Sequence, residues 1–146
     1  MSIFNGMNVS ASGMTAQRLR MDVISQNIAN VKTTRDENGK PYRRKTVVFA
    51  EKGTEPFAQI LSSKTGANIG NGVKVVEITE DTETPMNLVY DPSHPDADEN
   101  GYVEYPNVNT VTEMTNLIDA SRAYEANVTA FNATKNMALK GLEVGK

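Results

Sequence analysis

The chain has 146 residues, of which 38% are hydrophobic, 6% aromatic and 23% charged, and this length predicts one domain or one core with a modest insertion. It contains no cysteine, which excludes disulfide frameworks, thiol nucleophiles and cysteine metal sites. Its net charge of −3 conceals a net +4 over residues 32–50 and a net −8 over residues 73–108, and the acidic run argues against a nucleic-acid partner.

A long helix is predicted from Ile3 to Asn30, because apolar residues recur there every three or four positions and define one face. Gly6 and Gly13 weaken this helix locally, since an interior glycine costs about 1 kcal/mol relative to alanine. The helix therefore needs a partner to pack on. The apolar members that we expect in an assembly core are Met7, Met14, Met21, Ile24 and Ile28.

A second long helix is predicted from Thr110 to Leu142, where a strict three–four alternation gives the coiled-coil period. Its start fits a capping box in which Thr110 and Glu113 satisfy each other's helix-end donors, and Gly141 and Gly145 mark its end. Its expected contributions to the assembly core are Met114, Leu117, Tyr124, Val128, Phe131 and Leu142.

The segment between the helices shows no helical period and is too long for a structureless loop. The sequence therefore predicts an α+β fold in which the helices of residues 1–31 and 109–146 pack as a coiled coil and residues 32–108 form a small inserted β-rich domain. Part of it, near residues 51–72, is expected to be mobile. The predicted strands are Tyr42–Phe49, Val73–Ile78, Met86–Tyr90 and Gly101–Glu104, with turns at Asn38–Gly39, Asp91–Pro92 and Asn100–Gly101.

Residues 96–101 match the first half of a calcium loop, in which alternate oxygens wrap an ion over a glycine turn. The second half fails, because Asn107 stands where a bidentate glutamate belongs and no helix precedes the loop. An acidic turn is therefore favoured over a calcium site. His94 has no second imidazole and is interpreted as a turn residue.

No catalytic constellation or cofactor site is predicted. Gly66, Gly70 and Gly72 do not follow a phosphate-binding order and are interpreted as a flexible entry to the strand at Val73. Acyl transfer has almost no support, because the chain lacks a nucleophile-elbow motif and has one histidine. Two alternatives stay open: a helix-flanked β-rich module that binds a ligand or calcium, and a small hydrolase.

Several motifs carry a family resemblance. Residues 10–17 and the signature formed by Asn27, Ala29, Asn30 and Thr33 resemble the bacterial flagellar rod and hook family. The runs at residues 41–45, 90–96, 105–109 and 120–127 resemble the C-type subunits of the proximal rod in particular. The resemblance covers most of the chain outside residues 51–72.

This resemblance implies a structural protein without enzymatic activity. Such a subunit polymerises with related rod proteins and with copies of itself into the drive shaft of the basal body, which transmits motor torque across the periplasm. It also implies export through the flagellar type III apparatus, in accord with a chain in which we expect no cleaved leader and no membrane span: the longest apolar run is residues 47–50. The signature is expected to stop the first helix.

Opposite charges in the middle of the chain suggest a contact between subunits, because complementary patches steer association and set register. An equally weighted interpretation places both charged runs on one sheet, where they neutralise each other within a subunit. The basic residues concerned are Arg43, Arg44 and Lys45, and the acidic ones are Asp91, Asp96 and Asp98, together with Glu99.

Overall fold

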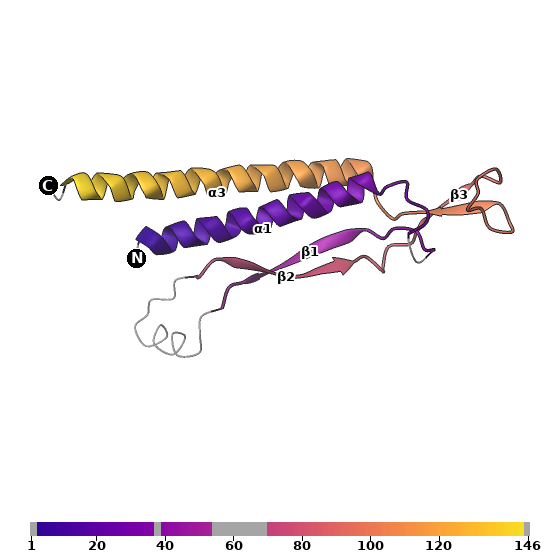
Figure 1. Ribbon diagram of the computed structural model, residues 1–146, viewed down its shortest axis with the longest axis horizontal. Coiled ribbons are helices and arrows are strands. Elements are labelled where there is room, and N and C mark those ends of the chain that lie inside the picture. Colours follow the sequence, from indigo (N-terminus) through magenta and orange to yellow (C-terminus); the bar gives the residue numbers. More distant parts are fainter. Residues whose placement is uncertain (1–2, 37–38, 54–69, 145–146) are drawn as a thin grey trace. The chain divides into compact units, whose positions relative to one another are not determined.

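The computed structural model describes residues 3–36, 39–53 and 70–144, and it confirms an α+β chain with two long helices and two small sheets (Figure 1). The predicted mobile stretch near residues 51–72 lies mostly outside the described residues, as do Asn38 and Gly66. No helix in the described ranges combines the length and apolar composition of a membrane span. The elements in chain order are α1 (Ile3–Ala29), β1 (Lys45–Glu51), β2 (Val73–Glu80), β3 (Asn87–Tyr90), β4 (Tyr102–Tyr105) and α3 (Thr110–Val144).

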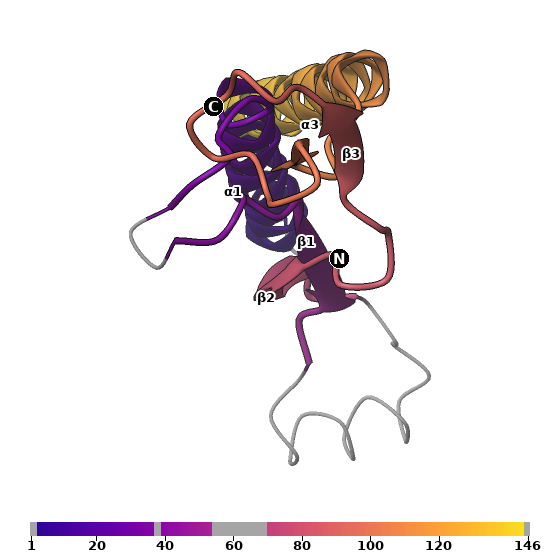
Figure 2. The ribbon, with the colours of Figure 1, turned by 90° about the vertical axis from the view of Figure 1, so that its right-hand side faces the viewer.

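Each sheet has two strands, and both are antiparallel. In the first, β1 and β2 lie side by side (Figures 1 and 2). The N–H of Asp81 donates to the carbonyl of Arg44, and the N–H of Lys52 donates to the carbonyl of Gly72, so these strands run in opposite directions. The four predicted strands exist and are displaced at their ends by at most three residues.

By their contacts the residues fall into two compact units, and both helices contribute to each. Unit 1 comprises Met1–Leu19, Val48–Glu77 and Ala120–Lys146. Unit 2 comprises Arg20–Val47 and Ile78–Asp119. The boundaries predicted for an inserted domain over residues 32–108, and coiled-coil packing of the helices, stay predictions.

In unit 1 the two helices approach closely where α1 has glycine. A Cβ atom built on Gly6 would lie 3.6 Å from Cγ2 of Thr134, and one built on Gly13 would lie 2.6 Å from Oδ1 of Asn127. Moving seven residues along α1 therefore corresponds to moving seven residues back along α3, which is an antiparallel register. The glycines that lower helix propensity in the sequence are the positions that let the helices come together.

A second close contact in unit 1 joins the start of β2 to α1. Ser12 Oγ donates to the carbonyl of Val9 at 2.7 Å and accepts the N–H of Val73 at 3.1 Å. Gly72 has a φ of +94°, and a Cβ atom there would lie 3.3 Å from the Cα of Val9. Gly72 lies at the entry to β2, as expected, and its backbone approaches the helix closely in a conformation that favours glycine.

In unit 2, β3 and β4 form a hairpin whose register places Leu88 opposite Glu104, Val89 opposite Val103 and Tyr90 opposite Tyr102. Side chains alternate between two faces. Val103 is buried, whereas Leu88 and Tyr90 on the other face are 63% and 64% exposed. The rings of Tyr90 and Tyr102 meet edge to face with their centroids 5.3 Å apart. The face that carries Leu88 and Tyr90 is thus apolar and uncovered, whereas the opposite face is buried at Val103 but exposed at Val89.

The contact at Gly72 predicts that Gly72→Ala destabilises the full chain by about 1–3 kcal/mol, because the alanine must hold a positive φ beside the backbone of α1. Gly70→Ala is the matched control: its φ lies outside the positive range, and its nearest foreign atom, Oε1 of Glu51, is at an ordinary 3.5 Å. Urea unfolding measures both. Equal effects of the two substitutions would show that the contact is unimportant.

Candidate functional site

Asn27, the first residue of the signature, is fully buried in unit 2. Its Nδ2 donates to the carbonyl of Lys45 at 2.8 Å and to Oε2 of Glu113 at 2.9 Å. Its Oδ1 accepts the N–H of Lys45 and the hydroxyl of Tyr42, each at 2.9 Å. Because the backbone of Lys45 supplies both an unambiguous donor and an unambiguous acceptor, the amide orientation is fixed and its whole hydrogen-bonding capacity is used.

Glu113 is the largest of the fully buried side chains among the described residues. Its Oε1 accepts a hydrogen bond from Nε of Arg44 at 2.8 Å, and its Oε2 accepts one from Nδ2 of Asn27. A buried carboxylate is tolerated when it is paired and hydrogen-bonded, and both conditions hold here. We call Asn27, Tyr42, Arg44 and Glu113, with the backbone of Lys45, the buried polar network.

The capping box predicted at the start of α3 is wrong. Asn109 is the cap, since its Oδ1 accepts the N–H groups of Val111 and Thr112 at 3.0 and 3.2 Å. Glu113 is therefore one residue too far along to close the box, and its carboxylate turns inward to Arg44. The tertiary pair outweighs the local pattern because without Arg44 the buried carboxylate of Glu113 would have no opposite charge beside it.

A second buried asparagine, Asn107, extends the network to the loop before β3. Its Oδ1 accepts the N–H of Arg44 at 2.9 Å, and its Nδ2 donates to the carbonyls of Asp81 and Thr84 at 3.0 and 3.2 Å. This contact explains why β1 begins at Lys45 and not at Tyr42: the N–H of Arg44 is taken by a side chain. Asn107 thus bonds the backbone N–H of Arg44, and Asn27 bonds the backbone of the next residue, Lys45, so the two side chains hold this segment in place.

The rest of the signature lies where α1 ends. Ala29 is the last residue of the helix. Asn30 donates from Nδ2 to the carbonyl of Gln26 at 2.9 Å, and Thr33 donates from Oγ1 to Oδ1 of Asn30 at 3.1 Å. Asn27 was expected to help end the helix. It lies inside α1 instead, and its side chain forms hydrogen bonds to residues outside the helix.

Arg43, Arg44 and Lys45 were expected to meet Asp91, Asp96 and Asp98. Among the described residues, their contacts are with other groups. Arg44 pairs with Glu113, and Lys45 Nζ lies 3.9 Å from Oε1 of Glu80. Arg43 donates from Nη1 to the carbonyl of Asp81 at 3.4 Å. The basic and acidic runs thus meet within the subunit at Lys45 and Glu80. Asp91, Asp96 and Asp98 take no part in this contact.

Those acidic residues support the loop that joins β3 and β4. Asp91 Oδ1 accepts from Ser93 Oγ at 2.6 Å, and Asp98 Oδ1 accepts the N–H groups of Asn100 and Tyr102 at 2.9 and 2.8 Å. Asp96 accepts from Thr34 Oγ1 at 2.9 Å. These contacts are those of an acidic turn, and no group of three or more metal-ligating side chains occurs within the described ranges.

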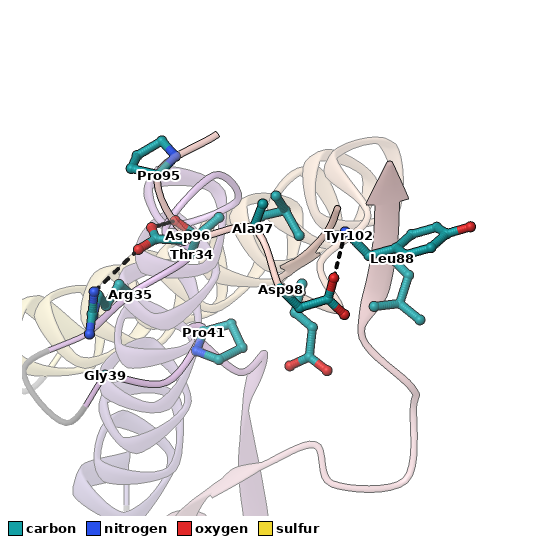
Figure 3. A pocket seen from close by; sticks show the side chains of 12 residues that line it. Thr34, Arg35, Gly39, Pro41, Leu88, Pro95, Asp96, Ala97, Asp98 and Tyr102 are labelled. Atoms are coloured by element: carbon teal, nitrogen blue, oxygen red, sulfur yellow. Dashed lines mark hydrogen bonds and ion pairs between the residues drawn. The ribbon is translucent and has the colours of Figure 1, made fainter. Parts of the chain in front are cut away.

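A polar pocket of about 430 Å³ lies in unit 2 beside this loop (Figure 3). Figure 3 shows Arg35 reaching Asp96, with Nη1 and Oδ1 3.4 Å apart, and the contact of Asp98 with Tyr102 on the other side. Leu88 lies next to Tyr102 in the wall. His94 is not in this pocket; its Nδ1 accepts the N–H of Asp96 and its ring lies against Tyr105.

The residues expected in an assembly core differ in exposure within the chain. Ile24 is buried, whereas Met114 and Leu142 are 54% and 72% exposed. At the start of α3 the buried residue is Glu113, whereas Met114 was expected to be buried. The buried side of the helix is therefore shifted by one residue there. The other members are half-buried: Met7, Met14, Met21, Ile28, Leu117, Tyr124, Val128 and Phe131.

The pKa values of Tyr42, Asp81 and Asp91 are shifted from their ordinary values. Burial raises the pKa of the Tyr42 phenol above its ordinary 10.0, and the charges of Glu80 and Glu113 raise it further. Hydrogen bonds from the backbone and side chain of Thr84 lower the pKa of Asp81. Those from the side chain and backbone of Ser93 lower the pKa of Asp91.

Comparison with known proteins gives a consistent result over the whole chain. Residues 7–35 match the family described as flagella basal body rod protein, and residues 99–144 match the family described as flagellar basal body rod FlgEFG protein C-terminal. The chain is 55% identical to the flagellar basal-body rod protein FlgC of Bacillus subtilis, with all of both chains covered. It is 47% identical to FlgC of Borreliella burgdorferi, over 99% of this chain and 98% of that one. It is 40% identical to FlgC of Escherichia coli O157:H7, over the full length of both.

The buried polar network predicts that Asn27→Ala lowers the free energy of unfolding by about 3 kcal/mol or more, since it leaves Oε2 of the buried Glu113 and two backbone groups of Lys45 without hydrogen-bond partners. Asn30→Ala, in the same signature, removes only contacts at the helix end and should cost about 1 kcal/mol. Urea unfolding followed by circular dichroism compares them. Equal losses would refute the assigned role of Asn27.

The raised pKa of Tyr42 predicts a loss of stability in alkali. A raised pKa means that the phenol contributes stability fully below pH 10, and that this contribution disappears as the pH rises through the raised value. The wild-type chain should therefore lose more stability than Tyr42→Phe between neutral pH and about pH 11. Parallel pH dependence of the two unfolding free energies would contradict this assignment.

Proposed function

Because the chain belongs to the FlgC family of flagellar basal-body rod proteins, we propose that it polymerises with related rod proteins and with copies of itself into the drive shaft that carries motor torque across the periplasm. It is a structural subunit of the rod of the bacterial flagellar basal body, and its family is not enzymatic. The ligand-binding and hydrolase alternatives have no support in these relatives.

The observation that carries the proposal is the amount of apolar surface that the chain leaves uncovered. On the first turns of α3, Val111, Met114 and Ile118 are 72%, 54% and 53% exposed. Their spacing of three and four residues places them on one side of the helix. Contiguous exposed apolar residues mark surfaces that partners cover. A subunit that is buried on several sides by its neighbours has this property.

The same observation supports export in an unfolded state through the flagellar type III apparatus. Long helices draw little stability from propensity and most of it from the surface they bury. With part of that surface uncovered in the single chain, contact with neighbours supplies the remaining stability after passage. Folding and assembly are then completed at the rod.

The charged contact between subunits is proposed in a narrower form. Arg44 is committed to Glu113 inside the chain, and Asp98 supports its own turn. Arg43, which has only a long contact to a carbonyl, and the exposed Glu99 next to Asp98 are the better pair for a neighbour. Such rim charges set the rate and register of association more than its strength.

Val128→Asp is predicted to abolish incorporation into the rod, because it places a charge in the half-buried stripe of α3, where removing a carboxylate from water costs about several kcal/mol. Glu125→Lys, on the exposed side of the same turn, should be much milder. Motility and rod fractionation in a bacterium that lacks its own FlgC measure both. Wild-type motility of Val128→Asp would refute a role of this stripe in assembly.

The proposed charged contact predicts that Arg43→Glu lowers incorporation and that adding Glu99→Lys restores part of it. The reason is that the reversed pair recovers the attraction between neighbouring subunits. Circular dichroism of each purified variant checks that the fold is retained. If the double variant incorporates no better than Arg43→Glu alone, the two residues do not meet.

A further inference from the structure

The last turns of α3 extend past the beginning of α1 in unit 1, as Figure 1 shows at the two chain ends. With Gly6 beside Thr134 and Gly13 beside Asn127, the antiparallel register brings Ile3, where α1 begins, to the level of Met137. Residues 138–144 therefore have no residue of α1 beside them. We call this part of α3 the overhang.

The overhang continues the side of α3 that packs on α1. Phe131 and Ala138 on this side are half-buried. Four residues after Ala138, Leu142 comes to the same side and is 72% exposed, and Leu139 is 50% exposed. An intrachain interface thus continues into an apolar surface that nothing in the described chain covers.

The rim of this surface is basic. Lys135, Leu139 and Leu142 are spaced by four and three residues, which places them together on the helix. Lys135 is exposed. Lys140 is also exposed, but its Nζ pairs with Glu143 at 2.7 Å. Lys135 is therefore the charge that a partner of the overhang would meet.

The pocket of unit 2 has the complementary chemistry. Leu88 and Tyr102, 63% and 44% exposed, form its apolar wall, and Asp98 and Glu104 add acidic groups. The one arginine in the lining, Arg35, pairs with Asp96, so the acidic groups remain in excess. Figure 3 shows Leu88, Tyr102 and Asp98 around the same opening.

We propose that the overhang of one copy docks into this pocket of a second copy, with Leu139 and Leu142 against Leu88 and Tyr102 and with Lys135 toward the acidic rim. The arguments are the continuity of the overhang with the α1–α3 interface and the opposite charges of the two rims. Since the two surfaces differ, the contact is heterologous, so each copy offers an overhang to one neighbour and a pocket to another. The inference rests on the proposed assembly and names one of its contacts.

Cysteine cross-linking tests this contact directly, because the chain has no cysteine of its own. Full-length Leu142→Cys and Leu88→Cys chains, carrying tags of different size, are produced together in a bacterium that lacks its own FlgC, and rods are analysed after mild oxidation. A disulfide-linked pair of the two chains is expected. Val89→Cys is the matched control, since it lies on the opposite face of the hairpin and is 46% exposed. Cross-linking to Val89→Cys as strong as that to Leu88→Cys, or none to either, overturns the inference.

A second experiment separates this contact from the proposed function. Leu139→Ser/Leu142→Ser changes side chains that no part of the described chain covers, so the thermal unfolding midpoint of the monomer should be unchanged while incorporation into rods is lost. Wild-type incorporation of this variant overturns the docking and leaves the proposed function intact. Failure of the unmodified chain itself to enter rods would instead refute the proposed function.

Discussion

The fold of unit 2 depends on one buried carboxylate. Glu113 is completely buried, and removing a carboxylate from water is unfavourable by several kcal/mol unless hydrogen bonds and an opposite charge compensate. Asn27 and Arg44 supply them, and each comes from a different part of the chain. The end of α1, the approach to β1 and the start of α3 must therefore meet in one arrangement.

This constraint explains how a chain with little buried apolar surface still has a defined structure. The buried hydrophobic residues among those described are few and mostly small, and include Ala16, Val23, Val103 and Ala120. Polar contacts at Asn27 and Asn107 set the register, while larger apolar side chains such as Met114 and Leu142 stay exposed. Polar residues thus fix the arrangement within the subunit, while the exposed apolar ones are free for the contacts between subunits that we propose. That division suits a protein that acts in an assembly.

The helices and strands were predictable because periodicity and turn residues are local signals, and α1, α3 and the four strands lie close to their expected bounds. The buried polar network was not predictable in this way. Asn27 and Glu113 are 86 residues apart, and no spacing rule links them. From the sequence, Glu113 was interpreted as part of a capping box and Arg44 as part of a basic patch. Neither interpretation indicated that the two residues form a pair. Gly6 and Gly13 indicated that α1 needs a partner, but nothing local in the sequence identified Thr134 and Asn127 of α3 as the residues that pack beside them.

A double-mutant cycle on Asn27→Ala and Glu113→Ala measures the central claim directly. If the two side chains stabilise the fold as one unit, the loss in unfolding free energy of the double variant will be smaller than the combined losses of the single variants by about 1 kcal/mol or more. Losses that add to within about 0.3 kcal/mol would contradict the account, because they would show that Asn27 and Glu113 act independently.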